Sequence, residues 1–160
     1  MPKQNQRQVH ALTSDHQGLA RSISTLVEVT NVITNQKVLT NGIRDTGATN
    51  SAITQSAAAT LGLLPVKRIM VRGVHGSKEV NVYFVNITLE NENITLNTQV
   101  TECDELSSDN SIGMLIGMNI ITMGDFAVTN YHGNTTMSFR VPSLQKIDFV
   151  LDNSHSEQRS

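Results

Sequence analysis

The residues whose types and spacing could do chemistry form one short run, Asp45-Thr46-Gly47-Ala48, in which an acid precedes a small hydroxyl residue and two small residues. Two carboxylates held about 3 Å apart cannot both ionise, so such a pair shares one proton and provides a general base beside a general acid. The base can activate water while the acid donates to a carbonyl oxygen, which is a route to hydrolysis of an amide. No other Asp in the chain is followed by Thr-Gly or Ser-Gly. One chain therefore supplies one carboxylate, and a homodimer would supply the pair.

The neighbours of Asp45 suit such a pair. The Thr46 hydroxyl can bond the backbone of an opposing loop across a dimer axis and so fix the geometry of the carboxylates. Gly47 leaves room for a substrate backbone to lie against the loop, and the small side chain of Ala48 keeps the floor of the adjacent substrate subsite low. Asp125 lacks these neighbours, and we expect it to cap a turn or face water rather than act as a second acid.

These residues need a framework, and the sequence predicts a mainly β one, because short runs rich in Val, Ile and Thr alternate with Gly and Asn. Residues 26–33 and 38–43 are predicted strands, and the second of them delivers the chain to Asp45. Further strands are predicted at residues 66–72, 79–90, 94–101, 112–116, 126–131 and 135–141.

Two short helices are predicted beside the strands. One covers residues 54–61, where Thr54 can cap the first turn and Gly62 can end the last one. This helix directly follows the acid loop, residues 45–51, and we expect it to brace that loop. The other predicted helix covers residues 118–123.

A glycine-bounded turn, Gly73-Val74-His75-Gly76, separates two of the predicted strands and is typical of a mobile hairpin. His75 is interpreted as a solvated turn residue rather than a proton donor, because a histidine in an exposed turn is usually solvated.

Composition excludes several classes of function. The chain of 160 residues has 38% hydrophobic residues, enough for one domain with one core. A formal net charge of -2 and a pI near 6.2 argue against a nucleic-acid binder or an anionic-membrane binder. With no Trp, two Tyr and four Phe, the core is predicted to be mostly aliphatic.

No metal site and no cofactor are predicted. Cys103, the only cysteine, lies in an acidic stretch at residues 102–105, which should raise the pKa of its thiol and make it a poor nucleophile. No apolar run approaches the roughly 18 residues of a membrane span, so we expect a cytoplasmic chain with no membrane contact. Polar residues at 1–24 and 144–160 are predicted tails around a domain at 25–143.

Two segments resemble the signatures of retropepsin-like aspartic proteases, the retroviral proteases and their single-domain cellular relatives. The first is Ile43-Arg44-Asp45-Thr46-Gly47-Ala48-Thr49-Asn50-Ser51. The second is Met114-Leu115-Ile116-Gly117-Met118-Asn119-Ile120-Ile121-Thr122, in which apolar residues and a Gly run into a short helix. The glycine-bearing hairpin falls between them, as the family's flap does, and the resemblance covers residues 26 to 143.

The resemblance implies a closed β-barrel of the acid-protease type and an aspartic endopeptidase that works as a homodimer on a protein or peptide substrate. It makes Asp45 the catalytic residue and assigns the active-site loop and the dimer grip to Thr46-Gly47-Ala48. It places Leu115-Ile116-Gly117 behind the acid loop as an apolar support. Gly73-Val74-His75-Gly76 would be the flap that closes over an extended peptide.

Two departures from the family pattern leave a second interpretation open. Arg44 precedes the acid where the family has an apolar or aromatic residue. Its guanidinium could favour two ionised carboxylates, pair across the interface, or point away. Thr49 and Met118 replace an acid and a base that pair in many retroviral members, so packing rather than an ion pair is expected to join the loop to the helix. The alternative function is a catalytically weak or inactive dimer that binds extended peptides.

Overall fold

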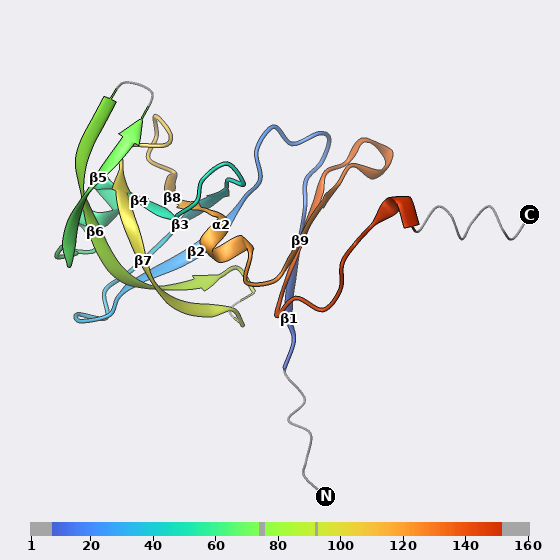
Figure 1. The fold of residues 1–160 in the computed structure, drawn as a ribbon, viewed down its shortest axis with the longest axis horizontal. Helices are drawn as coiled ribbons and strands as arrows, with labels where there is room; N and C mark the ends of the chain where they lie inside the picture. Colours follow the sequence, from blue (N-terminus) through green and yellow to red (C-terminus); the bar gives the residue numbers. More distant parts are fainter. Residues whose placement is uncertain (1–7, 74–75, 92, 152–160) are drawn as a thin grey trace, which may run out of the picture.

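The computed structural model describes residues 8–73, 76–91 and 93–151 of the 160-residue chain. In chain order the elements are β1 (His10–Asp15), β2 (Ser24–Asn31), β3 (Lys37–Arg44), β4 (Ala52–Thr54), α1 (Gln55–Thr60), β5 (Lys67–Gly73), β6 (Gly76–Leu89), β7 (Thr95–Cys103), β8 (Ile112–Ile116), α2 (Met118–Ile121), β9 (Asp125–Thr129), the 3-10 helix η1 (Tyr131–Gly133) and β10 (Thr136–Val141). The mainly β class predicted from the sequence is confirmed (Figure 1).

Six of the strands close into a barrel. Their hydrogen-bonded order is β2-β3-β8-β4-β7-β6, and β6 pairs back with β2 from Val27↔Leu89 to Asn31↔Val85. Closure gives each of these strands two neighbours, which removes the free edges of an open sheet. The predicted closed barrel is therefore confirmed.

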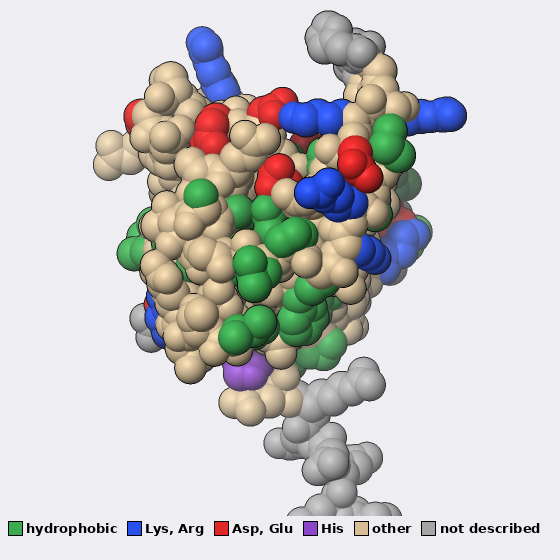
Figure 2. Space-filling view, turned by 90° about the vertical axis from the view of Figure 1, so that its left-hand side faces the viewer, with side chains coloured by type: hydrophobic (Ala, Val, Ile, Leu, Met, Phe, Trp, Pro, Cys, Tyr) green, Lys and Arg blue, Asp and Glu red, His purple; other side chains and the backbone are tan. Residues whose placement is uncertain are grey.

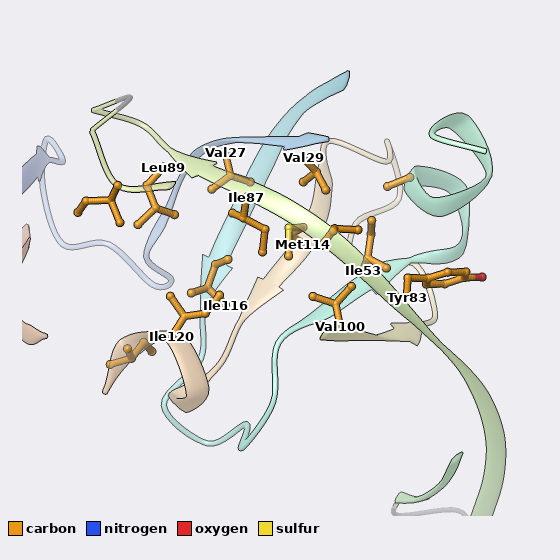
Figure 3. Close-up of a cluster of buried hydrophobic side chains, with 14 of the residues drawn as sticks. Val27, Val29, Ile53, Tyr83, Ile87, Leu89, Val100, Met114, Ile116 and Ile120 are labelled. Atoms are coloured by element: carbon orange, nitrogen blue, oxygen red, sulfur yellow. The ribbon is translucent and has the colours of Figure 1, made fainter. Parts of the chain in front are cut away.

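Aliphatic side chains fill the barrel (Figure 3). Along β2, Val27 and Val29 are buried and alternate with more exposed residues, as the two-residue period of a strand requires. Met114 and Ile116 of β8 point into the same cluster and are 0% and 1% exposed. The core is mostly aliphatic, as the composition predicts.

The predicted helix after the acid loop is confirmed as α1. The Thr54 hydroxyl accepts a hydrogen bond from the Ala57 backbone N–H at 3.3 Å, which caps the first turn. Gly62 has a φ of +60° and follows the last turn. Among the helices of the described residues, none combines the length and the apolar character needed to cross a bilayer.

The sequence did not reveal β4. Its three residues pair in parallel with β7 and antiparallel with β8, so β4 joins two parts of the barrel. Ala52, Ile53 and Thr54 are all buried. A strand this short and this buried has no alternation of apolar and polar residues by which a sequence could identify it.

A second sheet, of order β1-β10-β9, lies beside the barrel (Figure 1). Residues 10–15, which the sequence placed in a polar tail, form β1 instead, and β1 pairs with β10 from His10↔Val141 to Asp15↔Thr136. Leu12 is the one fully buried side chain of β1. The strand was missed because a single inward residue shows no period and its partner strand lies far along the chain.

β5 and β6 form a long hairpin that extends from the barrel. Among the described strands β5 pairs only with β6, in register from Lys67↔Val82 to Gly73↔Gly76. Figure 2 views the molecule from the side of this hairpin and shows apolar side chains gathered over the middle of the face, with charged side chains above them. Exposed apolar residues of these two strands include Met70 and Phe84.

Candidate active site

Asp45 lies at the end of β3, where that strand runs parallel to β8. The register pairs Arg44 with Ile116. The Asp45 backbone N–H then donates to the Ile116 carbonyl oxygen at 3.0 Å, which carries the pairing one residue beyond the strand. The second segment identified in the sequence therefore sets the position at which β3 ends and the acid loop begins.

The Asp45 carboxylate is held by its own loop. Its Oδ1 accepts a hydrogen bond from the Gly47 backbone N–H at 2.8 Å. The Ala48 backbone N–H donates to the Asp45 carbonyl oxygen at 3.3 Å, which closes the turn. Among the described residues Gly47 is the one hydrogen-bond partner of this carboxylate, so Oδ2 has no described partner.

The residues that follow Asp45 leave the loop open to its surroundings. Thr46 and Gly47 are exposed, whereas Asp45 and Ala48 are half-buried. A Cβ added to Gly47 would lie 3.1 Å from Asp45 Oδ1, so a side chain there would crowd the carboxylate. The Thr46 hydroxyl forms no hydrogen bond with the described residues of its own chain.

The predicted support lies directly beneath the loop. Ile116 and Gly117 are buried, and Leu115 is half-buried. A Cβ added to Gly117 would lie 2.6 Å from the Asn50 carbonyl oxygen and 2.9 Å from the Ala48 carbonyl oxygen. The loop backbone therefore rests on Gly117, and a glycine is required at this contact.

Backbone hydrogen bonds join the loop to α2 in addition to packing, and among the described residues no ion pair takes part. The Met118 backbone N–H donates to the Ala48 carbonyl oxygen at 2.8 Å, and the Asn119 backbone N–H donates to the Thr49 carbonyl oxygen at 3.0 Å. The first N–H groups of a helix have no partner within the helix. In this protein the carbonyl oxygens of Ala48 and Thr49 accept hydrogen bonds from these first N–H groups of α2.

Ser51 and Asn119 form a side-chain clamp that the sequence did not reveal. The Ser51 backbone N–H and Oγ–H both donate to Asn119 Oδ1, at 2.9 Å and 2.8 Å. Ser51 Oγ also accepts from the Gly117 backbone N–H at 3.0 Å. Ser51 is 0% exposed. The available signal was a short polar residue in each of the two signature segments, but nothing local indicates that they meet.

The predicted flap corresponds to the turn between β5 and β6. Gly73 and Gly76 are exposed and are opposite each other in the register. Gly76 has a φ of +119°, which residues with side chains rarely adopt. The other two predicted flap residues, Val74 and His75, lie outside the described residues.

Two cavities lie along the hairpin. One of about 410 Å³ is near the turn and is lined by Val71, Gly73, Gly76, Ser77, Lys78, Val80, Glu102, Cys103 and Asp104. The other, of about 170 Å³, reaches the acid loop and is lined by Asn50, Lys67, Ile69, Val82, Gln99, Val100 and Thr101. The hairpin and the acid loop thus border a common space.

A family model described as aspartyl protease matches residues 29–120, which is more than half of the chain and includes the acid loop, its support and the hairpin. The chain belongs to the aspartyl protease family. The family predicted from the two segments is confirmed. No curated protein matches the chain closely enough to count as a relative.

Several solved structures are similar to this aspartyl protease chain. A retropepsin-like aspartic protease from Rickettsia conorii is 16% identical over 84% of this chain and 94% of its own, with a TM-score of 0.49. The retroviral protease-like domain of Ddi1 from Leishmania major is 21% identical over 78% of this chain and 96% of its own, with a TM-score of 0.46. The protease of Simian Foamy Virus (mac) is 16% identical over 62% of this chain and 91% of its own, with a TM-score of 0.43.

Arg44, the departure beside the acid in this aspartyl protease chain, is directed away from Asp45. Its Nη1 donates to the Gly42 carbonyl oxygen at 3.0 Å, back along β3. Burial lowers the pKa of the guanidinium to about 10, while the charge of Glu90 acts in the opposite direction. Nη2 is buried without a partner among the described residues. The guanidinium is therefore still charged at neutral pH.

Asp125 caps a turn, as the sequence predicts. Its Oδ2 accepts from Arg140 Nε at 2.7 Å and from the Leu144 backbone N–H at 2.8 Å, and Oδ1 accepts from the Ser143 hydroxyl. The bond from Leu144 and those from Ser143 and Arg140 hold the pKa of this carboxyl well below its usual range. Both oxygens are bonded to Arg140 of β10 or to the turn that follows β10, so Asp125 is a structural acid.

Cys103 is a poor nucleophile in this setting. Burial raises the pKa of its thiol to about 11, and the charges of Asp104, Glu105 and Glu102 add to that effect. The thiol is therefore protonated near neutral pH. Within the described residues no group of three or more His, Cys, Asp or Glu side chains is arranged to hold a metal ion.

Proposed function

We propose that this chain is an aspartic endopeptidase that works as a homodimer, with Asp45 of each copy forming one catalytic pair. The observation that carries the proposal is the acid loop itself. Each chain has one Asp45 carboxylate, bonded through one oxygen to its own loop and with no described partner on the other. A loop exposed at Thr46 and Gly47 is accessible to the same loop of a second copy.

In the proposed reaction the two carboxylates share one proton. The ionised carboxylate takes a proton from a water molecule while the protonated one donates to the carbonyl oxygen of the scissile peptide bond. Water oxygen bonds to the carbonyl carbon, and the resulting tetrahedral intermediate loses the amine once its nitrogen has gained a proton. Neither carboxylate forms a covalent bond to the substrate.

We assign supporting roles to the residues around the pair. Thr46 would bond the backbone of the partner's loop, and Gly47 would accept a hydrogen bond from the peptide backbone. The turn at Gly73 and Gly76 would close over an extended peptide, which binds by strand-like hydrogen bonds. We favour activity over the inactive alternative, because the Arg44 Nη1 hydrogen bond runs to the Gly42 carbonyl oxygen and not to Asp45.

The test is the variant Asp45→Asn, which keeps the size of the side chain and removes its ionisation. Cleavage of a peptide library should fall by more than about 100-fold, because the general acid and base are both lost. The sedimentation mass should still be that of a dimer. Asp109→Asn is the matched control, since Asp109 is in an exposed turn where it accepts from Ser111. Full activity of Asp45→Asn would contradict the proposal.

Dimerisation has its own test, since one chain holds half of the proposed site. Specific activity should fall on dilution at the concentration where sedimentation shows dissociation. A monomer with constant specific activity across that range would contradict the two-chain site. The cytoplasmic location and the C-terminal limit of the domain at residue 143 stay predictions.

A further inference from the structure

The smaller cavity connects the acid loop to the base of the hairpin. Asn50 comes from the acid loop, Lys67 and Ile69 from β5, Val82 from β6 and Gln99 from β7. We call this space the Lys67 cavity. Because Asn50 is five residues from Asp45 on the same loop, a peptide that lies across the loop would pass this cavity.

The Lys67 cavity has a positive charge and unused polar groups. Among the described residues Lys67 forms no ion pair, and the side chains of Asn50 and Gln99 form no hydrogen bond. No carboxylate lines this cavity within the described part of the chain. Ile69 lines the cavity, is half-buried and provides an apolar wall next to these groups. Ammonium and amide N–H groups over an apolar wall match a carboxylate on a short methylene stem.

The larger cavity at the other end of the hairpin has the opposite character. Its lysine, Lys78, is already paired with Asp104 at 3.0 Å. Glu102 lines the same cavity and accepts hydrogen bonds from Asn81 and Tyr83. The one lysine there is neutralised by a neighbour, whereas Lys67 is not. The two ends of the hairpin therefore present different charges to a bound peptide.

We infer that the Lys67 cavity is a specificity site that binds an acidic side chain, Asp or Glu, of the peptide substrate. The inference rests on the proposed peptidase function for its substrate. The substrate carboxylate would accept from the Lys67 ammonium and from the amide of Asn50 or Gln99, with its methylene groups against Ile69. In a homodimer the cavity occurs twice, so an acidic residue is favoured on both sides of the scissile bond.

The experiment uses peptide pairs that differ only by Glu or Gln, placed in turn at each position within four residues of the cleavage site. At one position on each side, kcat/KM should be about three- to tenfold higher for the Glu peptide, the range expected of a partly exposed charged hydrogen bond. The ratio should fall toward one in high salt. Lys67→Met should abolish the preference for Glu. Lys67→Glu should instead cleave a peptide with Lys at this position faster than the matching Gln peptide.

Lys37→Met is the matched control. Lys37 pairs with Glu28 between β2 and β3 at 2.7 Å, so this variant makes the same change in net charge away from the cavity. It should keep the Glu preference. Equal rates for Glu and Gln peptides at every position, or a preference that survives in Lys67→Met, would overturn the inference.

Binding measurements separate this inference from the proposed function. The Asp45→Asn variant should bind the uncleaved Glu peptide about three- to tenfold more tightly than the Gln peptide in fluorescence anisotropy. A wild-type chain that binds with this preference but cleaves nothing would contradict the peptidase and keep the specificity site. A chain that cleaves the Glu and Gln peptides equally well would keep the peptidase and contradict the specificity site. Absence of binding to either peptide would overturn the specificity site.

Discussion

The acid loop and the β5–β6 hairpin border the same cavity, the first through Asn50 and the second through Lys67 and Ile69. The loop is bonded to β8 and α2 by backbone groups on both of its sides and by the clamp between Ser51 and Asn119. β5 pairs with one described strand, β6, and most of its residues are exposed. The acid loop is thus held at many points, whereas β5 has one described neighbouring strand, which suits the mobile flap that we propose for this hairpin.

Gly117→Ala should disrupt the support of the acid loop and have the largest effect. The added Cβ would lie 2.6 Å from a backbone oxygen of Asn50, which cannot rotate away. We expect the free energy of unfolding to fall by about 3 kcal/mol in urea titrations, with loss of peptide cleavage. Gly73→Ala is the control on the hairpin, because the nearest atom to its Cβ is 3.8 Å away. If the two variants lose equal stability, the contrast between the firmly held acid loop and the loosely held β5–β6 hairpin is wrong.

Asn119→Ala should weaken the attachment of the acid loop to α2 by removing the clamp between Ser51 and Asn119. The Ser51 backbone N–H and Oγ–H would lose their acceptor in a site that is 0% exposed. Leaving buried donors unpaired should lower the free energy of unfolding by about 2 kcal/mol, measured in urea titrations. Asn97→Ala removes an exposed hydrogen bond with Asn86 and should change stability by less than about 0.5 kcal/mol. A neutral Asn119→Ala would show that backbone bonds alone hold the loop.

The smallest effect is expected at Cys103, which lines the cavity near the hairpin turn. The reactivity of its thiol measures how well the hairpin shields this cavity. Since the pKa of the thiol is about 11, alkylation of the native chain by iodoacetamide at pH 8 should be slower than in the urea-unfolded chain and should rise toward pH 11. The thiol pKa in the folded chain lies above its ordinary value of 9.0. The unfolded thiol therefore ionises first, and this group's contribution to stability is lost as pH rises from about 9 to about 11. Cys103→Ser should remove that part of the pH dependence, and equal labelling rates in both states would contradict it.

The acid loop could be predicted because its chemistry is local. Asp45, Thr46 and Gly47 are adjacent, and the cap of α1 at Thr54 depends on residues within one turn. The clamp could not be predicted, because Ser51 and Asn119 are 68 residues apart and meet only when β3 and β8 pair in parallel.

The direction of the Arg44 side chain also depends on distant elements. From the sequence it could have faced the acid, the interface or neither. In the structure its Nη1 donates to the Gly42 carbonyl oxygen on the same strand, and the charge of Glu90, beyond the end of β6, acts on the guanidinium. Residue type alone carries no information on that choice, since a long flexible side chain reaches in several directions.

β1 has a consequence for the order in which the chain folds. Its partner strand is distant in sequence, with Thr13 and Ser138 separated by 125 residues. Contacts of such high sequence separation close a long loop and form slowly, because the entropy of that loop is lost before the contact is gained. The hairpin of β9 and β10 can form locally and then serve as the template on which β1 is added. We expect the barrel to close early and β1 to dock last, as a late folding step seen in hydrogen exchange of residues 10–15.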